Sequence, residues 1–179
     1  MKDPAIILET ERLYLRRWRE SDGELFADLN ADPDVMEHFP SVHKREESLA
    51  AVPRIDRRIE ENGFGLFAVE VKDGAPFIGF VGLQVPRFEA HFMPAVELGW
   101  RIAKEHWNQG YATEGALACV EFASGKLGLE PLISFTVPQN LASRRVMEKL
   151  GMTHDPNDDF DHPSLPEGHR LRRHVLYRL

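Results

Sequence analysis

The sequence contains a single cysteine, Cys119, among 179 residues. One cysteine cannot form an internal disulfide, and the chain shows none of the Cys/His spacings typical of structural zinc sites. No apolar run approaches the ~20 residues that a membrane-spanning helix needs. Residues 1–4 lack the apolar segment of a secretion signal. These absences predict a cytoplasmic protein with no metal site and no membrane attachment.

Basic residues are also in short supply. The chain has 22 Lys and Arg against 29 Asp and Glu, which gives a formal net charge of −7. Nucleic-acid-binding proteins usually show a basic excess or a basic stripe. The densest basic stretch, residues 170–174, lies in an alternating segment and is interpreted as the solvated face of a strand. No nucleic-acid partner is expected, and the acidic balance mildly favours the approach of a cationic substrate.

Length and ordinary globular composition predict one domain over residues 1–179. Hydrophobic periodicity and turn residues predict the elements in this order: a strand over 13–18, a helix begun by a Ser21–Glu24 capping box with Leu25, Phe26 and Leu29 inward, a helix over 46–61, strands over 64–71, 77–85 and 95–102, a helix over 111–127, a strand over 132–137, a helix over 141–150 and a strand over 174–179. This order predicts an α+β (mixed α/β) domain, and the βαβ segment 96–137 predicts two parallel neighbouring strands.

The loop before the helix at residue 111 carries the first chemical signal. Its residues are Trp107, Asn108, Gln109, Gly110, Tyr111, Ala112, Thr113 and Glu114. Gly110 and Ala112 allow a backbone to approach a bulky ligand. The first N–H groups of the helix have no internal partners, and the positive end of the helix dipole favours an anion such as a pyrophosphate. A tight glycine turn with no ligand explains this loop equally well.

The second signal is the segment from Asn140 to Met152. By itself it predicts an Asn-capped amphipathic helix that ends at Gly151, with Val146, Met147 and Leu150 packed inward. A purely structural reading therefore accounts for the segment, except for its pairing with the earlier loop.

Together the two segments resemble the GNAT superfamily of N-acetyltransferases, in particular its RimJ/RimL-like branch. The family's acetyl-CoA loop reads Q/R-x-x-G-x-G/A, and this chain has Trp107 at the first position, followed by Gly110 and Ala112. The later family motif, N-x-x-(A/S)-x-x-(V/L)-x-E-K-x-G-(F/M), is matched from Asn140 to Met152. The opening segment 8–16 and the closing segment 174–177 are likewise typical of the branch.

The resemblance implies a mixed, mostly antiparallel twisted sheet flanked by helices, in which a central parallel strand pair splays to admit the pantetheine arm of acetyl-CoA. A bulge near Gly99 is expected to aim an N–H at the thioester oxygen. The implied cofactor contacts lie in three segments: Trp100, Arg101 and Ile102; Trp107, Asn108, Gln109, Gly110, Tyr111, Ala112 and Thr113; and Asn140 and Ser143.

The resemblance also implies catalytic roles. An amine is largely protonated at neutral pH, so a proton acceptor is needed, and Glu97 is the candidate base. Deprotonation through a water chain, with Glu97 as an ordinary strand carboxylate, is the alternative. Many relatives carry a tyrosine acid where this chain has Met147, so Ser143 is assigned the acid role and Asn140 is expected to hold the cofactor and orient it. Ser143 as a plain first-turn residue is the competing interpretation.

The predicted function is direct transfer of an acetyl group, in a ternary complex, from acetyl-CoA to a primary amine on a protein N-terminus or a small molecule. A non-catalytic acyl-CoA sensor is the alternative. Relatives are often dimers, so a homodimer is one expected assembly. Isolated histidines, His162 among them, and the acidic stretch 155–163 are interpreted as loop or strand residues. Phe39, Phe64, Phe67 and Trp18 are candidates for the lining of the acceptor pocket, but aromatic residues at such spacing more often belong to the core. Cys119 is expected in the core.

Overall fold

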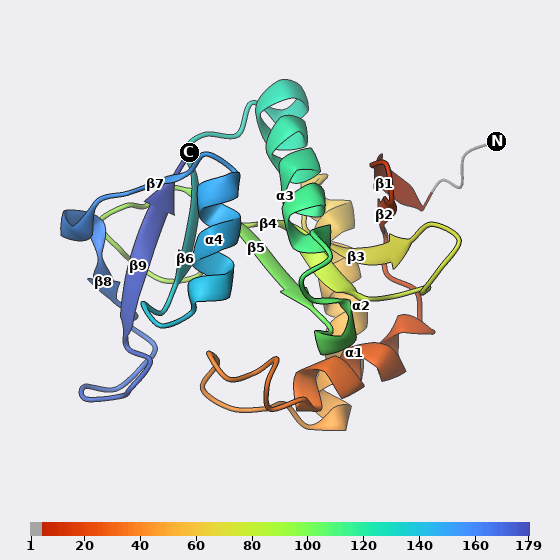
Figure 1. Cartoon of the computed structure of the whole chain (residues 1–179), viewed down its shortest axis with the longest axis horizontal. Helices are drawn as coiled ribbons and strands as arrows, with labels where there is room; N and C mark the ends of the chain where they lie inside the picture. Colours follow the sequence, from red (N-terminus) through yellow and green to blue (C-terminus); the bar gives the residue numbers. More distant parts are fainter. Residues whose placement is uncertain (1–4) are drawn as a thin grey trace.

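A nine-stranded sheet runs through the part of the protein that the computed structural model describes, residues 5–179, and helices cover both of its faces (Figure 1). The strands are β1 (Ile6–Glu9), β2 (Leu13–Arg16), β3 (Leu66–Val71), β4 (Gly79–Gln84), β5 (Val96–Ile102), β6 (Leu132–Thr136), β7 (Thr153–His154), β8 (Phe160–Asp161) and β9 (Arg173–Arg178). The helices are α1 (Asp22–Ala31), α2 (Arg45–Asn62), α3 (Tyr111–Phe122) and α4 (Leu141–Lys149).

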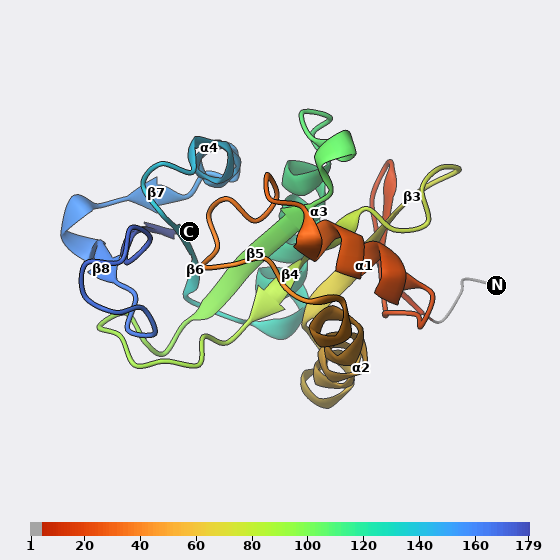
Figure 2. The same ribbon diagram turned by 90° about the horizontal axis from the view of Figure 1, so that it is seen from below.

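The strand order is β1-β2-β3-β4-β5-β6-β9-β7, with β8 paired to β9. Between residues 5 and 179 all of these pairs are antiparallel except β5 with β6. These two strands are joined through α3, as the βαβ pattern of residues 96–137 predicts. Figure 2 shows α3 and α4 on one side of the sheet and α2 on the other. The mixed, mostly antiparallel fold with a central parallel pair is confirmed.

The start of α1 differs from the prediction. Ser21 forms no side-chain cap, so the capping box is wrong. Asp22 instead turns inward and pairs with the buried Arg16, with 2.8 Å between Oδ2 and Nη1. A buried guanidinium needs a charged partner more than a helix end needs a cap. This pairing leaves Leu25 exposed, while Phe26 and Leu29 are buried as expected.

Glycines end the two long helices. Gly63 has a φ of 73° after α2, which runs without interruption through Pro53. The helix predicted over 111–127 is α-helical to Phe122 and continues as a π-helical turn over 123–127, which Gly128 closes with a φ of 61°. Strands β1, β7 and β8 were not predicted because two to four residues show too little alternation to detect.

The core lies between the sheet and the helices of both faces. Leu13, Phe67, Val81 and Leu98 are fully buried in it. Cys119 is buried among them, and its burial raises the pKa of the thiol, so its assignment as core is confirmed. No helix within residues 5–179 is long and apolar enough to cross a membrane.

Candidate functional site

The strands β5 and β6 part after two residues. Their parallel ladder, within the described chain, consists of Val96 opposite Leu132 and Glu97 opposite Ile133. Beyond this point β5 continues to Ile102 and β6 to Thr136 without pairing to each other (Figure 1). The splayed pair expected from the resemblance is therefore present, and Glu97 belongs to its last paired rung.

Peptide groups of β5 face the opening between these strands. The N–H of Ala103 donates to the carbonyl of Ile78 over 2.8 Å, at the end of the antiparallel pair of β5 with β4. Because successive residues of a strand direct their peptide groups to opposite sides, this bond shows which residues of β5 face β4 and which face away from it. By that alternation the peptide groups of Leu98, Trp100 and Ile102 point toward β6. Those of Trp100 and Ile102 lie past the end of the β5–β6 ladder.

The predicted bulge at Gly99 is wrong. The β4–β5 register runs unbroken from Gly79 opposite Ile102 to Gln84 opposite Glu97, with Gly99 opposite Gly82. The N–H of Gly99 is therefore directed at β4. In this regular ladder the N–H of Trp100 already points to the opening between β5 and β6, so no bulge is needed to direct it there.

Two of the predicted cofactor contacts on β5 are partly committed elsewhere. The side chain of Arg101 donates to Asn30 and lies 4.0 Å from the ring centroid of Phe39, on the α1 side of the sheet. Its peptide groups point toward β4, so the geometry turns Arg101 away from the opening. The carbonyl of Ile102 accepts from the indole of Trp107 over 2.7 Å, which ties the end of β5 to the loop before α3.

The N-terminus of α3 is open. Asn108 and Gly110 have positive φ angles of 59° and 84°, and the helix has no side-chain cap. The first intrahelical bond in this turn is from the N–H of Glu114 to the carbonyl of Gly110. The N–H groups of Tyr111, Ala112 and Thr113 are therefore available to an anion, and the helix dipole favours one.

A polar cluster that the sequence analysis missed holds this loop in place. Arg12 donates to the carbonyl of Gln109 (2.9 Å) and pairs with Glu114 (2.7 Å from Nε). The hydroxyl of Thr10 donates to the same carboxylate over 2.6 Å. Burial alone would raise the pKa of Glu114, but these bonds bring it below its usual range. The typical opening segment 8–16 was the available signal, although no role was assigned to it.

Asn140 caps α4 as predicted. Its Oδ1 accepts from the N–H of Ser143 over 3.1 Å, and its Nδ2 donates to the hydroxyl of Thr136 over 3.0 Å. Met147 is buried, as expected for the inward face of this helix. The cap bond goes to the backbone of Ser143, which leaves the Ser143 hydroxyl free of Asn140.

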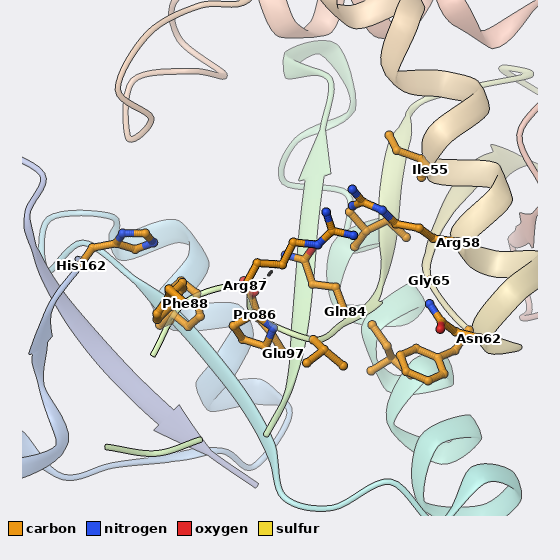
Figure 3. A pocket seen from close by; sticks show the side chains of 15 residues that line it. Ile55, Arg58, Asn62, Gly65, Gln84, Pro86, Arg87, Phe88, Glu97 and His162 are labelled. Carbon is orange, nitrogen blue, oxygen red and sulfur yellow. Dashed lines mark hydrogen bonds between the residues drawn. The ribbon is translucent and has the colours of Figure 1, made fainter. Parts of the chain in front are cut away.

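A pocket of about 570 Å³ opens on the α2 side of the sheet (Figure 3). Its lining comes from α2, the turn before β3, the strands β3, β4, β5 and β6, the segment after β4 and the segment around His162: Ile55, Arg58, Asn62, Phe64, Gly65, Leu66, Leu83, Gln84, Val85, Pro86, Arg87, Phe88, Glu97, Phe135 and His162. Of the aromatic residues expected in the core, Phe64 borders this pocket instead, while Phe67 and Trp18 are buried in the core.

Glu97 reaches this pocket from the last rung of the parting strands. Its Oε2 accepts from the side-chain amide of Gln84 over 2.9 Å. Burial raises the pKa of Glu97 to about 7, although the bond from Gln84 acts in the opposite direction. A carboxylate with a pKa near neutrality can both accept and release a proton at physiological pH.

His162 forms part of the opposite wall. Its ring lies 4.6 Å from that of Phe88, and burial lowers its pKa. The surrounding stretch 155–163 is not simply a solvated loop. Phe160 and Asp161 form β8 against β9, and Asp158 pairs with Arg178 over 2.6 Å. The acidic residues there hold the C-terminal strands together, and His162 is the residue of the stretch that lines the pocket.

The open N-terminus of α3 and the pocket thus lie on opposite faces of the sheet, and the parting of β5 from β6 lies between them. Comparison with protein families gives a match for the acetyltransferase (GNAT) domain over residues 12–153. The chain belongs to the GNAT acetyltransferase family. Its members use acetyl-CoA as the acetyl donor and act on amine acceptors, so the protein is an N-acetyltransferase.

Individual relatives agree. The uncharacterized N-acetyltransferase YnaD of Bacillus subtilis is 28% identical over 96% of this chain and 95% of its own length. A GNAT-family acetyltransferase of Bacillus anthracis has the same fold, with 25% identity, a TM-score of 0.79 and 96% coverage of both chains. The RimL ribosomal L7/L12 α-N-protein acetyltransferase, solved in complex with coenzyme A, is 15% identical over 97% of both chains, with a TM-score of 0.75. This last likeness concerns the fold alone.

Proposed function

We propose that this GNAT enzyme transfers the acetyl group of acetyl-CoA directly to a primary amine that binds in the pocket beside Glu97. The observation that carries the proposal is the position of Glu97, which belongs to the last rung before β5 and β6 part and also lines the pocket. A donor entering through the opening from the α3 side and an amine in the pocket would meet at this carboxylate.

The residues on the α3 side suit the donor. Uncapped N–H groups at Tyr111, Ala112 and Thr113 fit a pyrophosphate, and Asn108 and Gly110 curve the backbone around it. The peptide groups of Trp100 and the N–H of Ile102 fit the amides of a pantetheine arm, because an extended amide chain pairs with an open strand edge. Acetyl-CoA supplies a thioester carbonyl as the electrophile.

Three groups of this chain would carry the proton and charge changes. Glu97 accepts a proton from the ammonium form of the amine, which makes the nucleophilic free base. The N–H of Trp100 faces the opening and stabilises the charge that develops on the acyl oxygen, a contribution of about 3 kcal/mol for one such donor. The hydroxyl of Ser143 at the start of α4 relays the second proton: it donates its own proton to the departing thiolate and accepts the proton that the nitrogen of the tetrahedral intermediate releases, so that the serine is restored and the amide is neutral.

Initial-rate kinetics test the proposal. Purified protein is first titrated with acetyl-CoA, and then incubated with acetyl-CoA and a panel of amines that includes amino acids, polyamines, amino sugars and peptides with free N-termini. We expect an N-acetylated product by mass spectrometry and intersecting double-reciprocal lines, as for a ternary complex. Parallel lines would contradict direct transfer. Tight acetyl-CoA binding with no product from any amine would contradict catalysis and indicate a sensor.

A further inference from the structure

Two arginines face the pocket on its open side. Arg58 reaches it from α2, and Arg87 comes from the segment that follows β4. Figure 3 shows their guanidinium groups directed toward each other, beside Gln84 and Glu97. Because they come from segments nearly thirty positions apart in sequence, the fold and not a local basic run brings them together.

Neither guanidinium is in contact with a carboxylate in the described chain. The side chains of Arg58 and Arg87 form no ion pair or hydrogen bond within residues 5–179, whereas Arg12, Arg16, Arg17 and Arg178 all pair with carboxylates there. In a chain with a net charge of −7, unpaired arginines that face each other are unusual. Like charges held at close range repel, and this repulsion is relieved when an anion binds between them.

The other charges at the pocket do not neutralise this pair. Burial lowers the pKa of Arg58, and the nearby charges of Arg87 and Arg54 lower it further, while Glu61 raises it. Glu97 is the one lining residue able to carry a negative charge, and its raised pKa keeps it partly protonated at neutral pH. The lining is therefore electropositive, although the protein as a whole is acidic.

We propose that Arg58 and Arg87 form an anion subsite, so that the acceptor is an amine that also carries a carboxylate or a phosphate. This inference rests on the proposed function, because it takes the pocket as the place where the amine binds. It disfavours polyamines and other purely cationic acceptors. The aromatic wall of Phe88, Phe135 and His162 suits an apolar or aromatic portion of the same molecule.

Two sources of the anionic group are distinguished by matched acceptors. L-Phenylalanine is compared with L-phenylalaninamide, and a Ser-Glu-Phe peptide amide with Ser-Gln-Phe amide. A charge-assisted pair predicts a kcat/KM about 10- to 100-fold higher for the anionic member. A preference in the first pair indicates a small amino acid, and one in the second indicates an acidic protein N-terminus. The amine of phenylalaninamide is the weaker base, so the first comparison is biased against the expected result.

The double variant Arg58→Gln/Arg87→Gln should reduce that preference to within about threefold. Arg57→Gln is the matched control, because Arg57 lies on the same helix, is exposed and does not line the pocket. It should keep the preference. Equal use of charged and uncharged members by the wild type, or a preference that survives in the double variant, overturns the anion subsite while leaving acetyl transfer itself intact.

A binding measurement tests, independently of turnover, whether an anion binds at Arg58 and Arg87. The protein is saturated with CoA, so that the N-terminus of α3 is occupied, and is then titrated with inorganic phosphate at low ionic strength. We expect phosphate to raise the melting temperature of the wild type and of Arg57→Gln, but not that of the double variant. An equal effect on all three proteins, or none on the wild type, contradicts the inference even when no amine is acetylated.

Discussion

In the proposed function, the two faces of the sheet bind the two substrates with different chemical groups. On the α3 side the features that suit a cofactor are peptide groups: the uncapped turn at Tyr111 and the free strand edge at Trp100. On the α2 side the pocket is built from side chains of α2, four strands, the segment after β4 and the segment around His162. Backbone groups suit a cofactor that a whole family shares, because the fold preserves their positions. Side chains suit an acceptor that differs between members, because substitution changes them readily. Variants on the two faces should therefore affect the two substrates separately.

The largest expected effect on substrate binding is on the cofactor side. Gly110 has a φ of 84°, and a Cβ at this position would lie 3.3 Å from Nη2 of Arg12. Strain of about 1–3 kcal/mol should therefore weaken acetyl-CoA binding by Gly110→Val about 10- to 100-fold. Isothermal titration with acetyl-CoA checks this. Gly125→Ala is the control, since Gly125 has no positive φ and no neighbour near its added Cβ, and a similar loss there would break the comparison.

The next effect is on the pH dependence of stability and is expected from Glu97 in the pocket. The folded pKa of Glu97, about 7, lies above its ordinary value of 4.5, so folding favours the protonated form. The stability that Glu97 contributes is complete below pH 4.5 and is lost as pH rises through 7. Glu97→Gln cannot titrate and keeps an acceptor for Gln84. The difference between the free energies of unfolding of Glu97→Gln and the wild type should therefore shift by about 2 kcal/mol in favour of the variant when the pH is raised from 5 to 8.

Urea denaturation at the two pH values measures this gain. Glu89→Gln, an exposed position in the segment after β4, provides the control and should show no such change. A constant difference between wild type and Glu97→Gln at both pH values would show that Glu97 is not desolvated.

A smaller effect is expected from the cluster that holds the cofactor loop. Arg12→Gln removes the pair with Glu114 and the bond to the carbonyl of Gln109. Because the Arg12 side chain is 44% exposed, solvent screens the pair, and acetyl-CoA affinity should fall by about fivefold. Arg45→Gln breaks an exposed pair with Glu24 on the opposite side of the sheet and should leave that affinity unchanged. Equal losses in the two variants would refute a local role for Arg12.

An effect of similar size to that of Arg12→Gln is expected at the start of α4. A thiol has a pKa near 8.5, so the departing thiolate is stable without full protonation, and Ser143→Ala should lower kcat by no more than about tenfold. Asn140→Ala removes the cap instead and should cost about 1 kcal/mol of stability. Full turnover in Ser143→Ala together with loss of turnover in Asn140→Ala would make Ser143 a structural neighbour only.

The same contrast explains how much the sequence could predict. The loop at 107–114 and the helix at Asn140 are contiguous segments, so the glycine turn, the helix that follows it and the Asn140 cap could be predicted from local residue types. The parting of β5 from β6 was expected only from the resemblance to the family. The regularity of β5 at Gly99 was missed, because a glycine in a strand is compatible with a bulge and with a flat ladder. The cap of α1 was predicted wrongly, because the partner that drew Asp22 inward, Arg16, is buried only in the folded chain.

Most of the pocket could not be predicted from the sequence. Arg58, Arg87 and His162 belong to segments that read locally as a helix face, a loop and an acidic stretch. Their meeting depends on how α2 and the C-terminal strands pack on the sheet, which no local pattern encodes. Glu97 was predicted only through the resemblance to the family, and its raised pKa depends on burial that the sequence does not display.

The pH dependence of kcat/KM tests most directly whether Glu97 takes the proton of the amine. An acceptor from the amine panel with an amine pKa above 9 is compared in wild type and Glu97→Gln. The wild-type value should rise tenfold per pH unit and level off near pH 7, where Glu97 becomes ionised. Glu97→Gln should be slower at pH 7 by about 10²- to 10⁴-fold and should keep rising up to the pKa of the amine itself. Identical profiles in the two proteins would contradict the account.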